Sequence, residues 1–365
     1  MKNVFGHNVS VTLFGESHGA EIGAVIDGLA PGIAVNEEFI DLQLSLRRPV
    51  GAISTARVES DRFRIVSGVF EGRTTGTPVC ILIPNENTKS KDYAKTKDLA
   101  RPGHADYTAE CKYHGYQDYR GGGHFSGRVT AALVAAGAIA IDALRQKGIL
   151  IGTHIKTLAG VSDRDFDGNA LVDDINKLNS LEFAALDENA AEQMREEIIK
   201  AKQDSDSVGG VLETVILGMP AGVGEPWFDS VESLISHAMF SIPGIKGVEF
   251  GDGFDIAKLR GSEANDEMRV ENGKVVALSN HNGGINGGIS NGMPIVFRCA
   301  VKPTPSIFKA QNTVDFKEMN NATIALEGRH DPAIIHRARV VVDSMAALTI
   351  CDLLSGRYGT DWLVK

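Results

Sequence analysis

The sequence predicts an α+β fold built from two similar halves that pack against each other, and three observations support this prediction. The 365-residue chain is 43% hydrophobic and 23% charged, which is ordinary for a globular protein and leaves enough apolar residues for a large core. It contains 40 glycines, about 11% of the chain, where average usage is roughly 7%. Glycine-rich blocks also recur in the same order in the two halves of the chain.

Three pairs of segments carry this internal repeat. The pairs are 19–33 with 209–223 at an offset of 190, 68–79 with 284–295 at an offset of 216 and, more weakly, 128–144 with 339–355 at an offset of 211. One glycine-rich match alone would mean little, but three in one order favour a duplicated subdomain. We therefore expect a single domain over 1–365, with pseudo-repeated halves at roughly 1–160 and 207–365.

Each half is expected to contain strands, glycine turns and one long helix. In the first half, apolar runs bounded by glycine or proline predict strands at 9–14, 24–27, 63–67 and 79–83. Phe39, Leu42 and Leu46 have the spacing of an amphipathic helix. The alanine-rich stretch 128–144 and the apolar stretch 340–354 predict further helices, and the second of these is expected to be buried.

Residues 161–206 form an acidic segment between the two repeats. This segment contains 13 acidic and 5 basic residues, so it holds −8 of the total formal charge of −10 and leaves −2 for the rest of the chain. Apolar residues at helical spacing, including Leu186, Met194 and Ile198, predict inserted surface helices. The negative total argues against a nucleic-acid or acidic-membrane partner, but its location leaves a local basic pocket for a small anion.

The cysteines and the apolar segments bear on the cellular compartment in which the protein is expected. The four cysteines are scattered and lack the spacing of a metal site, so no metal is expected; they are Cys80, Cys111, Cys299 and Cys351. They are interpreted as small buried residues in a reducing cytosol. Residues 1–19 lack an apolar core of signal-peptide length, and the run 131–141 is too short to span a bilayer. These features predict a soluble cytoplasmic protein.

Two loops of the first half carry candidate functional residues. His18 lies in the glycine-flanked sequence GESHG, where a histidine can act as a general acid. Taken alone, this motif favours an ordinary surface histidine in a turn. Arg47 and Arg48 follow the amphipathic helix. They can bind phosphate or carboxylate, or they can simply place positive charge at the end of a helix.

Two further loops of the first half combine cations with histidine. Arg101 and His104 flank a Pro-Gly turn, which fixes their relative direction. The sequence GGGHFSGR at 121–128 leads directly into the alanine-rich helix. A glycine loop that opens a helix presents free backbone N–H groups and is a typical anion site. The loop lacks the lysine of a P-loop and does not fit G-x-G-x-x-G, so a phosphate site without nucleotide hydrolysis is predicted.

The second half contributes two polar loops. The sequence KPTPS at 302–306 places one cation and two hydroxyls on a stretch that two prolines stiffen. Arg329, His330 and Asp331 precede a proline, which holds Asp331 in an extended conformation. Each loop taken singly could be merely polar. The combination of cations with histidine or serine in several loops of an acidic chain favours a site for an anion.

These motifs, in this order, resemble those of the chorismate synthase family over essentially the whole chain. The resemblance rests on GESHG at 15–19, RPGHADY at 101–107, SGR at 126–128 and GRHDP at 328–332. It implies a sandwich of helices between two mainly antiparallel sheets, assembled as a homotetramer. It also implies the anti-1,4-elimination of phosphate from 5-enolpyruvylshikimate 3-phosphate to give chorismate in the shikimate pathway, with reduced FMN and no net redox change.

The resemblance assigns roles to individual residues. His18 would act as general acid toward the departing phosphate, His104 would protonate or stabilise the reduced flavin, and Asp331 would help to move a proton at flavin N5. The residues implied to bind the anionic groups of the substrate are Arg47, Arg48, Arg128 and Arg329. The implied FMN contacts are Arg47, His124, Phe125, Ser126, Pro243, Gly244, Gly287, Lys302, Pro303, Thr304, Pro305, Ser306 and Arg329.

Two departures from the family pattern bear on these roles. No charged residue follows Arg47-Arg48-Pro49 until Arg57, which weakens a contact to a pyridine nucleotide or leaves that contact to Arg57. His124 and Phe125 replace the usual small or basic residues before Ser126. The sequence leaves open whether NADPH reduces the flavin on this protein or on a separate reductase.

Two other classes of protein share some of these sequence features. A flavin-binding or phosphate-sugar-binding protein that has lost turnover would keep the fold, but the presence of His18, His104 and Asp331 argues against it. A nucleic-acid binder would need a continuous stripe of cations with exposed aromatic residues, whereas these cations are dispersed among glycine turns.

Overall fold

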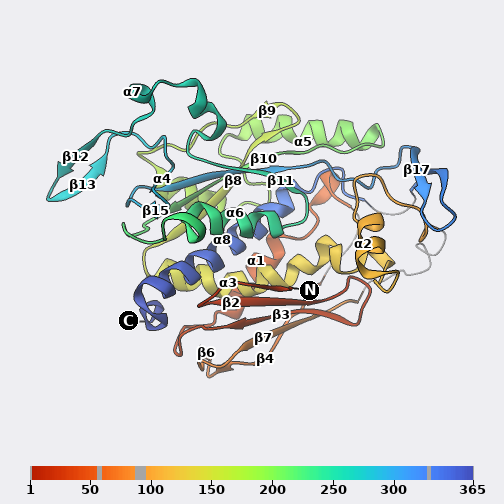
Figure 1. Cartoon of the computed structure of the whole chain (residues 1–365), viewed down its shortest axis with the longest axis horizontal. Coiled ribbons are helices and arrows are strands. Elements are labelled where there is room, and N and C mark those ends of the chain that lie inside the picture. Colours follow the sequence, from red (N-terminus) through yellow and green to blue (C-terminus); the bar gives the residue numbers. More distant parts are fainter. Residues whose placement is uncertain (1, 56–59, 87–95, 327–329, 365) are drawn as a thin grey trace.

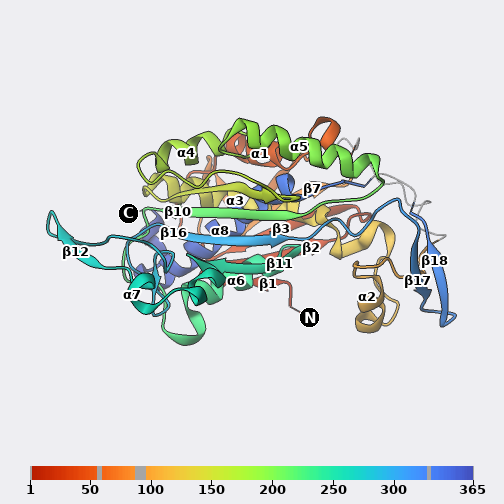
Figure 2. The ribbon, with the colours of Figure 1, turned by 90° about the horizontal axis from the view of Figure 1, so that it is seen from above.

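The computed structural model describes residues 2–55, 60–86, 96–326 and 330–364, which form two five-stranded antiparallel sheets with long helices between them (Figure 1). The predicted α+β class and the sandwich of helices between two sheets are both confirmed. Seen from above, strands of the two sheets overlap in projection, with the core helices between them (Figure 2).

The first sheet comes from the N-terminal part of the chain and has the order β1-β2-β3-β7-β4. Its strands are β1 (Val4–Phe5), β2 (Ser10–Gly15), β3 (Glu21–Asp27), β4 (Arg64–Ser67) and β7 (Val79–Pro84). Alternate residues of β7, such as Val79, Ile81 and Ile83, are fully buried, as expected for a sheet with one face on the core. The four predicted strands are therefore present, and their ends differ from the predicted ones by at most three residues.

The second sheet has the order β11-β16-β10-β8-β9, again with antiparallel pairing throughout. Its strands are β8 (Leu150–Leu158), β9 (Val161–Ser162), β10 (Gly210–Leu217), β11 (Ile245–Phe250) and β16 (Ile295–Val301). The long strand β10 lies at the centre and pairs with β8 on one side and β16 on the other.

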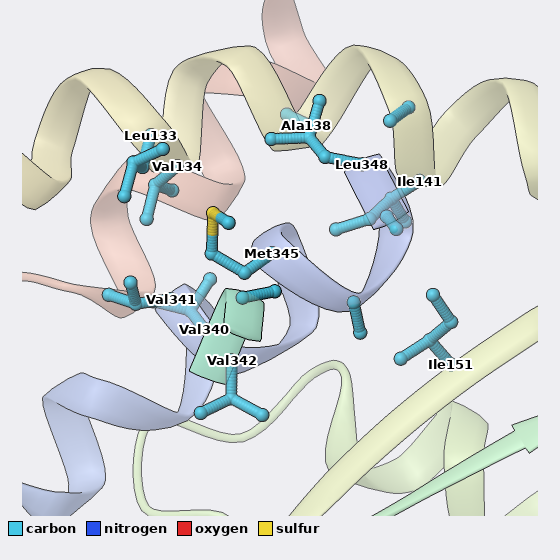
Figure 3. Close-up of a cluster of buried hydrophobic side chains, with 14 of the residues drawn as sticks. Leu133, Val134, Ala138, Ile141, Ile151, Val340, Val341, Val342, Met345 and Leu348 are labelled. Atoms are coloured by element: carbon cyan, nitrogen blue, oxygen red, sulfur yellow. The ribbon is translucent and has the colours of Figure 1, made fainter. Parts of the chain in front are cut away.

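Two parallel helices fill the space between the sheets. They are α3 (Thr130–Gln146), which contacts strands of the first sheet, and α8 (Ile335–Tyr358), which contacts strands of the second. Gly137 permits their close approach, because a Cβ at this position would lie 2.3 Å from the Cβ of Ser344. Apolar side chains of the two helices interdigitate along this contact (Figure 3). Both helices run from the side of α2 toward the side of the C-terminus (Figure 1).

Shorter helices cover the remaining surfaces of the core. They are α1 (Glu37–Leu46), α2 (Asp106–Tyr113), α4 (Leu171–Leu178), α5 (Glu188–Gln203), α6 (Val231–Ser241) and the single turn α7 (Gly261–Ala264). The acidic segment 161–206 contains α4 and α5, which contact β8 and β9 along one edge of the second sheet (Figure 2).

Four two-stranded hairpins complete the fold. They are β5–β6 (Val69–Phe70 and Arg73–Thr74), β12–β13 (Met268–Glu271 and Lys274–Ala277), β14–β15 (Ile285–Asn286 and Ile289–Ser290) and β17–β18 (Gln311–Asp315 and Asn320–Ile324). The β12–β13 hairpin projects away from the body at one end of the molecule, and the β17–β18 hairpin lies beside α2 at the other (Figures 1 and 2).

The same local arrangement occurs beside both sheets. Thr74 Oγ1 accepts a hydrogen bond from Ile33 N at 2.9 Å and donates one to Ala30 O at 2.6 Å. Ser290 Oγ accepts from Val223 N at 3.0 Å and donates to Pro220 O at 2.7 Å. These contacts are consistent with the internal repeat of the sequence; the division into halves at 160 and 207 stays a prediction.

The apolar segment 127–146 is the one stretch of the described residues that is long and apolar enough to cross a membrane, with a mean hydropathy of 1.6 over its most apolar window. That window is 89% buried between the two sheets, as expected for a core helix. The expectation of four buried cysteines is wrong for Cys111, which is exposed on α2, and Cys80 is only half-buried. Burial raises the pKa of Cys299 and Cys351 to about 12, so both remain neutral thiols at physiological pH.

Candidate active site

The glycine loop before α3 lies between two of the predicted catalytic histidines. Gly121, Gly122 and Gly123 have φ values of +60°, +84° and +52°, which favour residues without a Cβ. A Cβ on Gly121 would lie 2.2 Å from Cε1 of His18, and a Cβ on Gly122 would lie 3.2 Å from Cε1 of His104. His18 and His104 are therefore brought to the two sides of one loop, although 86 residues separate them in the sequence.

Ser17 links His18 to this loop. Its side chain is buried, and Oγ lies 3.1 Å from Nδ1 of His18 and 3.2 Å from the carbonyl oxygens of Arg120 and Gly121. The backbone N–H of Ser17 donates to the carbonyl of Gly123 at 3.1 Å. The turn that carries His18 is thus bonded to the glycine loop by both backbone and side chain.

His104 lies in a turn that an ion pair closes. Asp106 Oδ1 is 3.1 Å from Nδ1 of His104 and accepts a hydrogen bond from Nη2 of Arg101 at 2.7 Å. Burial opposes ionisation of Asp106, but the hydrogen bonds from Arg101 and His104 outweigh burial and hold its pKa well below the usual range. The side chain of His104 is 17% exposed, so this pair is close to solvent.

Lys302 ties the His104 turn to the second half of the chain. Its ammonium group donates to the carbonyl oxygen of Gly103, and its backbone N–H donates to Gly244 O at 2.9 Å. Burial, together with the nearby charge of Lys246, lowers the pKa of Lys302. The buried hydroxyl of Thr304 has no hydrogen-bond partner among the described residues.

Two of the predicted anion-binding arginines are buried around one carboxylate. Arg128 donates through Nη1 to Asp61 Oδ1, and Nη1 of Arg47 is 3.7 Å from Asp61 Oδ2. Arg47 also donates from Nε to Thr130 Oγ1 at 3.0 Å and from Nη2 to Gly127 O at 2.8 Å. Both guanidinium groups are thereby fixed at the N-terminus of α3, and Asp61 offsets part of their charge.

Asn85 connects this arginine cluster to the His18 turn. Its Oδ1 accepts from Nε of Arg128 at 3.0 Å, and its Nδ2 donates to Glu16 O at 2.9 Å and Gly19 O at 3.0 Å. Arg48 lies nearby and donates from Nη2 to Ser60 O at 2.7 Å. A continuous set of hydrogen bonds therefore runs from the His18 turn to the buried arginines.

Asp331 is held just before α8 by two partners. Its Oδ1 accepts from the backbone N–H of Thr55 at 2.8 Å, and its Oδ2 accepts from Nη1 of Arg337. Arg337 also donates from Nε to Arg47 O at 2.8 Å, which joins Asp331 to the arginine cluster. The adjacent His336 is fully buried, and burial lowers its pKa to about 4, so it is neutral at physiological pH.

Three of the other predicted cofactor residues lie beside the glycine loop. The Nδ1 atom of His124 lies 2.8 Å from the carbonyl oxygen of Gly15. Phe125 packs against Tyr113 with ring centroids 5.9 Å apart, and the hydroxyl of Ser126 caps the turn before α3. These three residues belong to the glycine-loop end. Arg329 and Arg57 lie outside the described residues.

Gly287 is not brought to that end by the fold. Gly288, the next residue, accepts through its carbonyl from Val231 N at the start of α6, whereas Pro243 and Gly244 follow the end of the same helix. Gly287 and the Gly244–Lys302 contact therefore lie toward opposite ends of α6.

Sequence reasoning missed three acidic or amide side chains that organise the site. Asp61 pairs with Arg47 and Arg128, Asn85 bridges two loops, and Asp106 contacts His104. Asp106 lies within a motif that the sequence did single out, so a local signal existed for it. Asp61 and Asn85 have no such signal, because their partners are distant in the sequence.

The arrangement can bind anions and move protons. The first turns of α3 and α8 both contact Arg47, through Thr130 and Arg337, and the helix dipoles there favour negative charge. Two imidazoles and one carboxylate supply groups that can donate or accept a proton. No cluster of three or more side chains suitable for a metal ion occurs in the described part of the chain.

Comparisons with known proteins agree with this description. The sequence model of the family described as chorismate synthase matches residues 9–354. The chain is 46% identical to the chorismate synthase of Pyrococcus abyssi over 349 residues, which cover 96% of each protein, and 44% identical to that of Thermococcus kodakarensis over 360 residues, 99% of each. A solved structure titled "Crystal Structure of Chorismate Synthase" superposes with a TM-score of 0.77 at 29% identity and covers 97% of this chain and 94% of its own.

Proposed function

The chain belongs to the chorismate synthase family and is an enzyme of the lyase class, and we propose that it converts 5-enolpyruvylshikimate 3-phosphate to chorismate and phosphate. The proposed reaction is an anti-1,4-elimination with reduced FMN as cofactor and without net redox change, within the shikimate pathway. The observation that carries the proposal is the pair of imidazoles on the two sides of the glycine loop, beside buried arginines at the N-terminus of α3.

The charge of the site supports a substrate with several anionic groups. 5-Enolpyruvylshikimate 3-phosphate carries two carboxylates and a phosphate, and each can accept hydrogen bonds from guanidinium or backbone N–H groups. Arg47 and Arg128 are held in fixed directions by Asp61, Thr130 and Asn85, so little side-chain freedom is lost when an anion binds. We propose that Arg47, Arg48, Arg128 and Arg329 bind these groups.

The same geometry supports the proton-transfer roles that we propose. We assign to His18 the protonation of a phosphate oxygen as the phosphate departs, because an imidazolium beside this oxygen stabilises the developing charge. His104, on the other side of the glycine loop, would hold a proton at the flavin. Asp331, which Thr55 N and Arg337 keep in place, would accept or pass on a proton at flavin N5.

The residues present fit FMN at this end of the molecule. The unpartnered hydroxyl of Thr304, the ammonium group of Lys302, and Ser126 at the start of α3 offer donors to its phosphate and ring carbonyls. Pro303, Pro305, Ser306, Pro243, Gly244, His124, Phe125 and Arg329 would complete the contact. Reduced FMN supplies an electron-rich centre for loss of the allylic phosphate, and the protein supplies binding, orientation and protons.

We also propose a homotetramer in the cytoplasm. Support for assembly comes from the projecting β12–β13 hairpin, on which Met268, Val270 and Val275 are 58%, 72% and 66% exposed. A two-stranded hairpin is marginally stable by itself, so burial against another copy would stabilise it.

The four cysteines are free, which suits a reducing compartment. NADPH would act only indirectly, as the reductant that keeps FMN reduced.

An anaerobic assay tests the proposed function. The purified protein is mixed with reduced FMN and 5-enolpyruvylshikimate 3-phosphate, and phosphate and chorismate are measured together. We expect equal amounts of the two products, many turnovers per FMN, and no turnover with oxidised FMN. Intact FMN binding without any product would contradict the proposed reaction and leave a flavin-binding protein instead.

A further inference from the structure

We propose that Asp106 is a positioning residue that keeps a proton on Nδ1 of His104, so that Nε2 faces the glycine loop. This inference rests on the proposed function for the importance of His104, but its geometry is independent of the reaction. Asp106 is the first residue of α2, and it lies two residues after the histidine that it contacts.

The carboxylate of Asp106 is fixed by one neighbour. Arg101 donates to Oδ2 from its backbone N–H at 2.9 Å and from Nε at 2.8 Å, and it donates to Oδ1 from Nη2 at 2.7 Å. These three bonds use both oxygens and restrict rotation of the carboxylate. The remaining acceptor capacity of Oδ1 points at Nδ1 of His104, at 3.1 Å.

The backbone of the turn restrains the histidine from the other direction. His104 N donates to Arg101 O at 3.0 Å, and Lys302 Nζ donates to the carbonyl of Gly103. Pro305 also packs against the turn, because a Cβ on Gly103 would lie 3.4 Å from the Cβ of Pro305. The backbone position of His104 is therefore fixed, and Asp106 fixes the rotation of the imidazole about its side-chain bonds.

The surroundings of Nδ1 decide which ring nitrogen carries the proton. Nδ1 also lies 3.0 Å from Nη2 of Arg101, which has only hydrogens to offer. That nitrogen already donates to Asp106, and a carboxylate forms a stronger bond with an N–H group than a guanidinium forms with a neutral ring nitrogen. Nδ1–H therefore donates to Asp106, as in other histidines whose proton a carboxylate fixes.

This assignment leaves Nε2 as the working nitrogen. A Cβ on Gly122 would lie 3.4 Å from Nε2 and 3.2 Å from Cε1, so this edge of the ring faces the loop. In the neutral ring Nε2 carries the lone pair, and in the imidazolium it carries the transferable proton. Asp106 thus acts on the reaction only through His104.

Nitrogen-15 NMR of the full-length protein reads the position of the proton directly. With ¹⁵N-labelled histidine, and with His104→Gln used to assign the signal, we expect neutral His104 to carry its proton on Nδ1. In Asp106→Asn the proton is expected to move to Nε2, and kcat is expected to fall at least about 10-fold, with KM within about two-fold of wild type.

Asp174→Asn is the matched control. Asp174 accepts two bonds from Arg164 and one from the backbone N–H of Asp167 at 3.1 Å, but it contacts no histidine. This control should leave the His104 signal and kcat unchanged. A proton on Nε2 in the wild type, or an unchanged tautomer in Asp106→Asn, would overturn the inference. Absence of turnover in the wild type, with the Nδ1 proton present, would instead count against the proposed function alone.

Discussion

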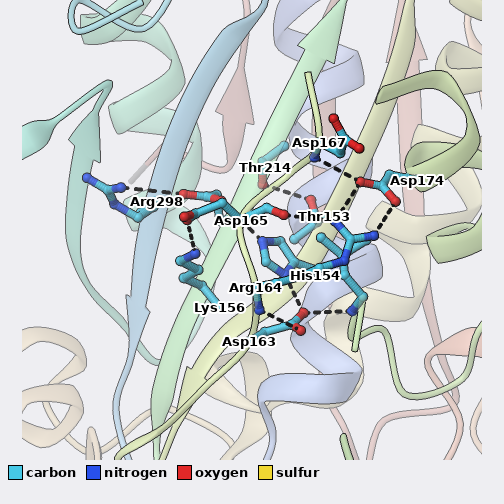
Figure 4. A network of polar contacts seen from close by, with 12 residues as sticks. Thr153, His154, Lys156, Asp163, Arg164, Asp165, Asp167, Asp174, Thr214 and Arg298 are labelled. Atoms are coloured by element: carbon cyan, nitrogen blue, oxygen red, sulfur yellow. Dashed lines mark hydrogen bonds and ion pairs between the residues drawn. The ribbon is translucent and has the colours of Figure 1, made fainter. Parts of the chain in front are cut away.

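His104 and His154 are both bonded to carboxylates, and their surroundings differ sharply. His104 contacts Asp106 in a turn beside the glycine loop, and its side chain is 17% exposed. His154 lies on β8 with 0% exposure, between Asp163 at 2.7 Å and Glu213 at 3.1 Å (Figure 4). A histidine–carboxylate pair is therefore not by itself a sign of catalysis; access to a ligand distinguishes the two.

The His154 network is built into the second sheet. The sheet register places His154 opposite Glu213, Glu213 opposite Arg298, and Arg298 opposite Glu249, so opposite charges alternate across four strands. Asp163 also accepts from Leu186 N at 2.6 Å and Asp187 N at 2.9 Å, which anchors the acidic segment 161–206 to the sheet. This network stabilises the fold, whereas the His104 pair faces the proposed site.

Removal of either active-site imidazole should have the largest effect. His18→Ala and His104→Ala are each expected to lower kcat by about 10²-fold to 10⁴-fold, because general acid–base groups contribute on that scale. Thermal unfolding should be nearly unchanged, since neither ring belongs to the core. Steady-state rates and calorimetry on the same preparations check both statements. Wild-type rates in both variants would show that the roles are misassigned.

Removal of His154 should affect stability instead. His154→Ala leaves Asp163 and Glu213 without their buried partner, which is expected to lower the free energy of unfolding by about 3–5 kcal/mol. The folded fraction should keep its kcat. Urea unfolding measures the loss, and Lys258→Ala, which removes an exposed pair with Asp255, is the control that should leave the free energy of unfolding nearly unchanged. A lower kcat at full folding would place His154 in the reaction.

A methyl group on the glycine loop should disturb His18 without changing any catalytic residue. Gly121→Ala places a Cβ 2.2 Å from Cε1 of His18 at a φ of +60°, so the imidazole must move. Displacement of a reacting group by about 1 Å can cost up to about 10²-fold in rate. Gly148→Ala is the control, because its φ is +76° but no atom lies within 4 Å of the added Cβ. Equal rates in the two variants would contradict the placement of His18.

The smallest expected effect is the change with pH in the stability that the His154 network contributes. Burial alone would lower the pKa of His154, but its bonds to Asp163 and Glu213 outweigh burial and raise it. The pKa values of the two carboxyl groups are lowered, because the bonds to His154 outweigh their burial. The network therefore stabilises the fold most from above about pH 4 to about pH 6.5, the ordinary values of these groups.

The sign of this effect can be checked against a variant. As the pH rises through the raised pKa of His154, its contribution is lost, by about 1.4 kcal/mol for each unit of the shift. As the pH falls through the lowered pKa values of Asp163 and Glu213, their contribution is lost in turn. The difference in unfolding free energy between wild type and His154→Gln should therefore decrease above neutral pH. A difference that grows with pH would mean that His154 is neutral in the folded protein.

Much of the fold could be predicted from the sequence because the signals are local. Apolar runs bounded by glycine or proline predict four of the five strands of the first sheet, and the alanine-rich stretch predicts α3. The motifs around His18, His104 and Gly121 are contiguous in sequence, so they were recognised, and the fold brings them together.

The remaining features depend on contacts between distant residues. His154, Glu213, Arg298 and Glu249 come from four strands, and only the sheet register aligns them. Asp61 meets Arg128 across 67 residues. Gly287, which the family resemblance implies as an FMN contact, lies toward the opposite end of α6 from Gly244, and no sequence pattern reveals this.

A structure of the protein determined without oxygen, with FMN and 5-enolpyruvylshikimate 3-phosphate bound, tests the central claim most directly. We expect both ligands at the end where α3 and α8 begin, with His18 and His104 each within hydrogen-bond reach of a ligand atom. Ligands bound away from the glycine loop, or with both imidazoles out of reach, would contradict the account.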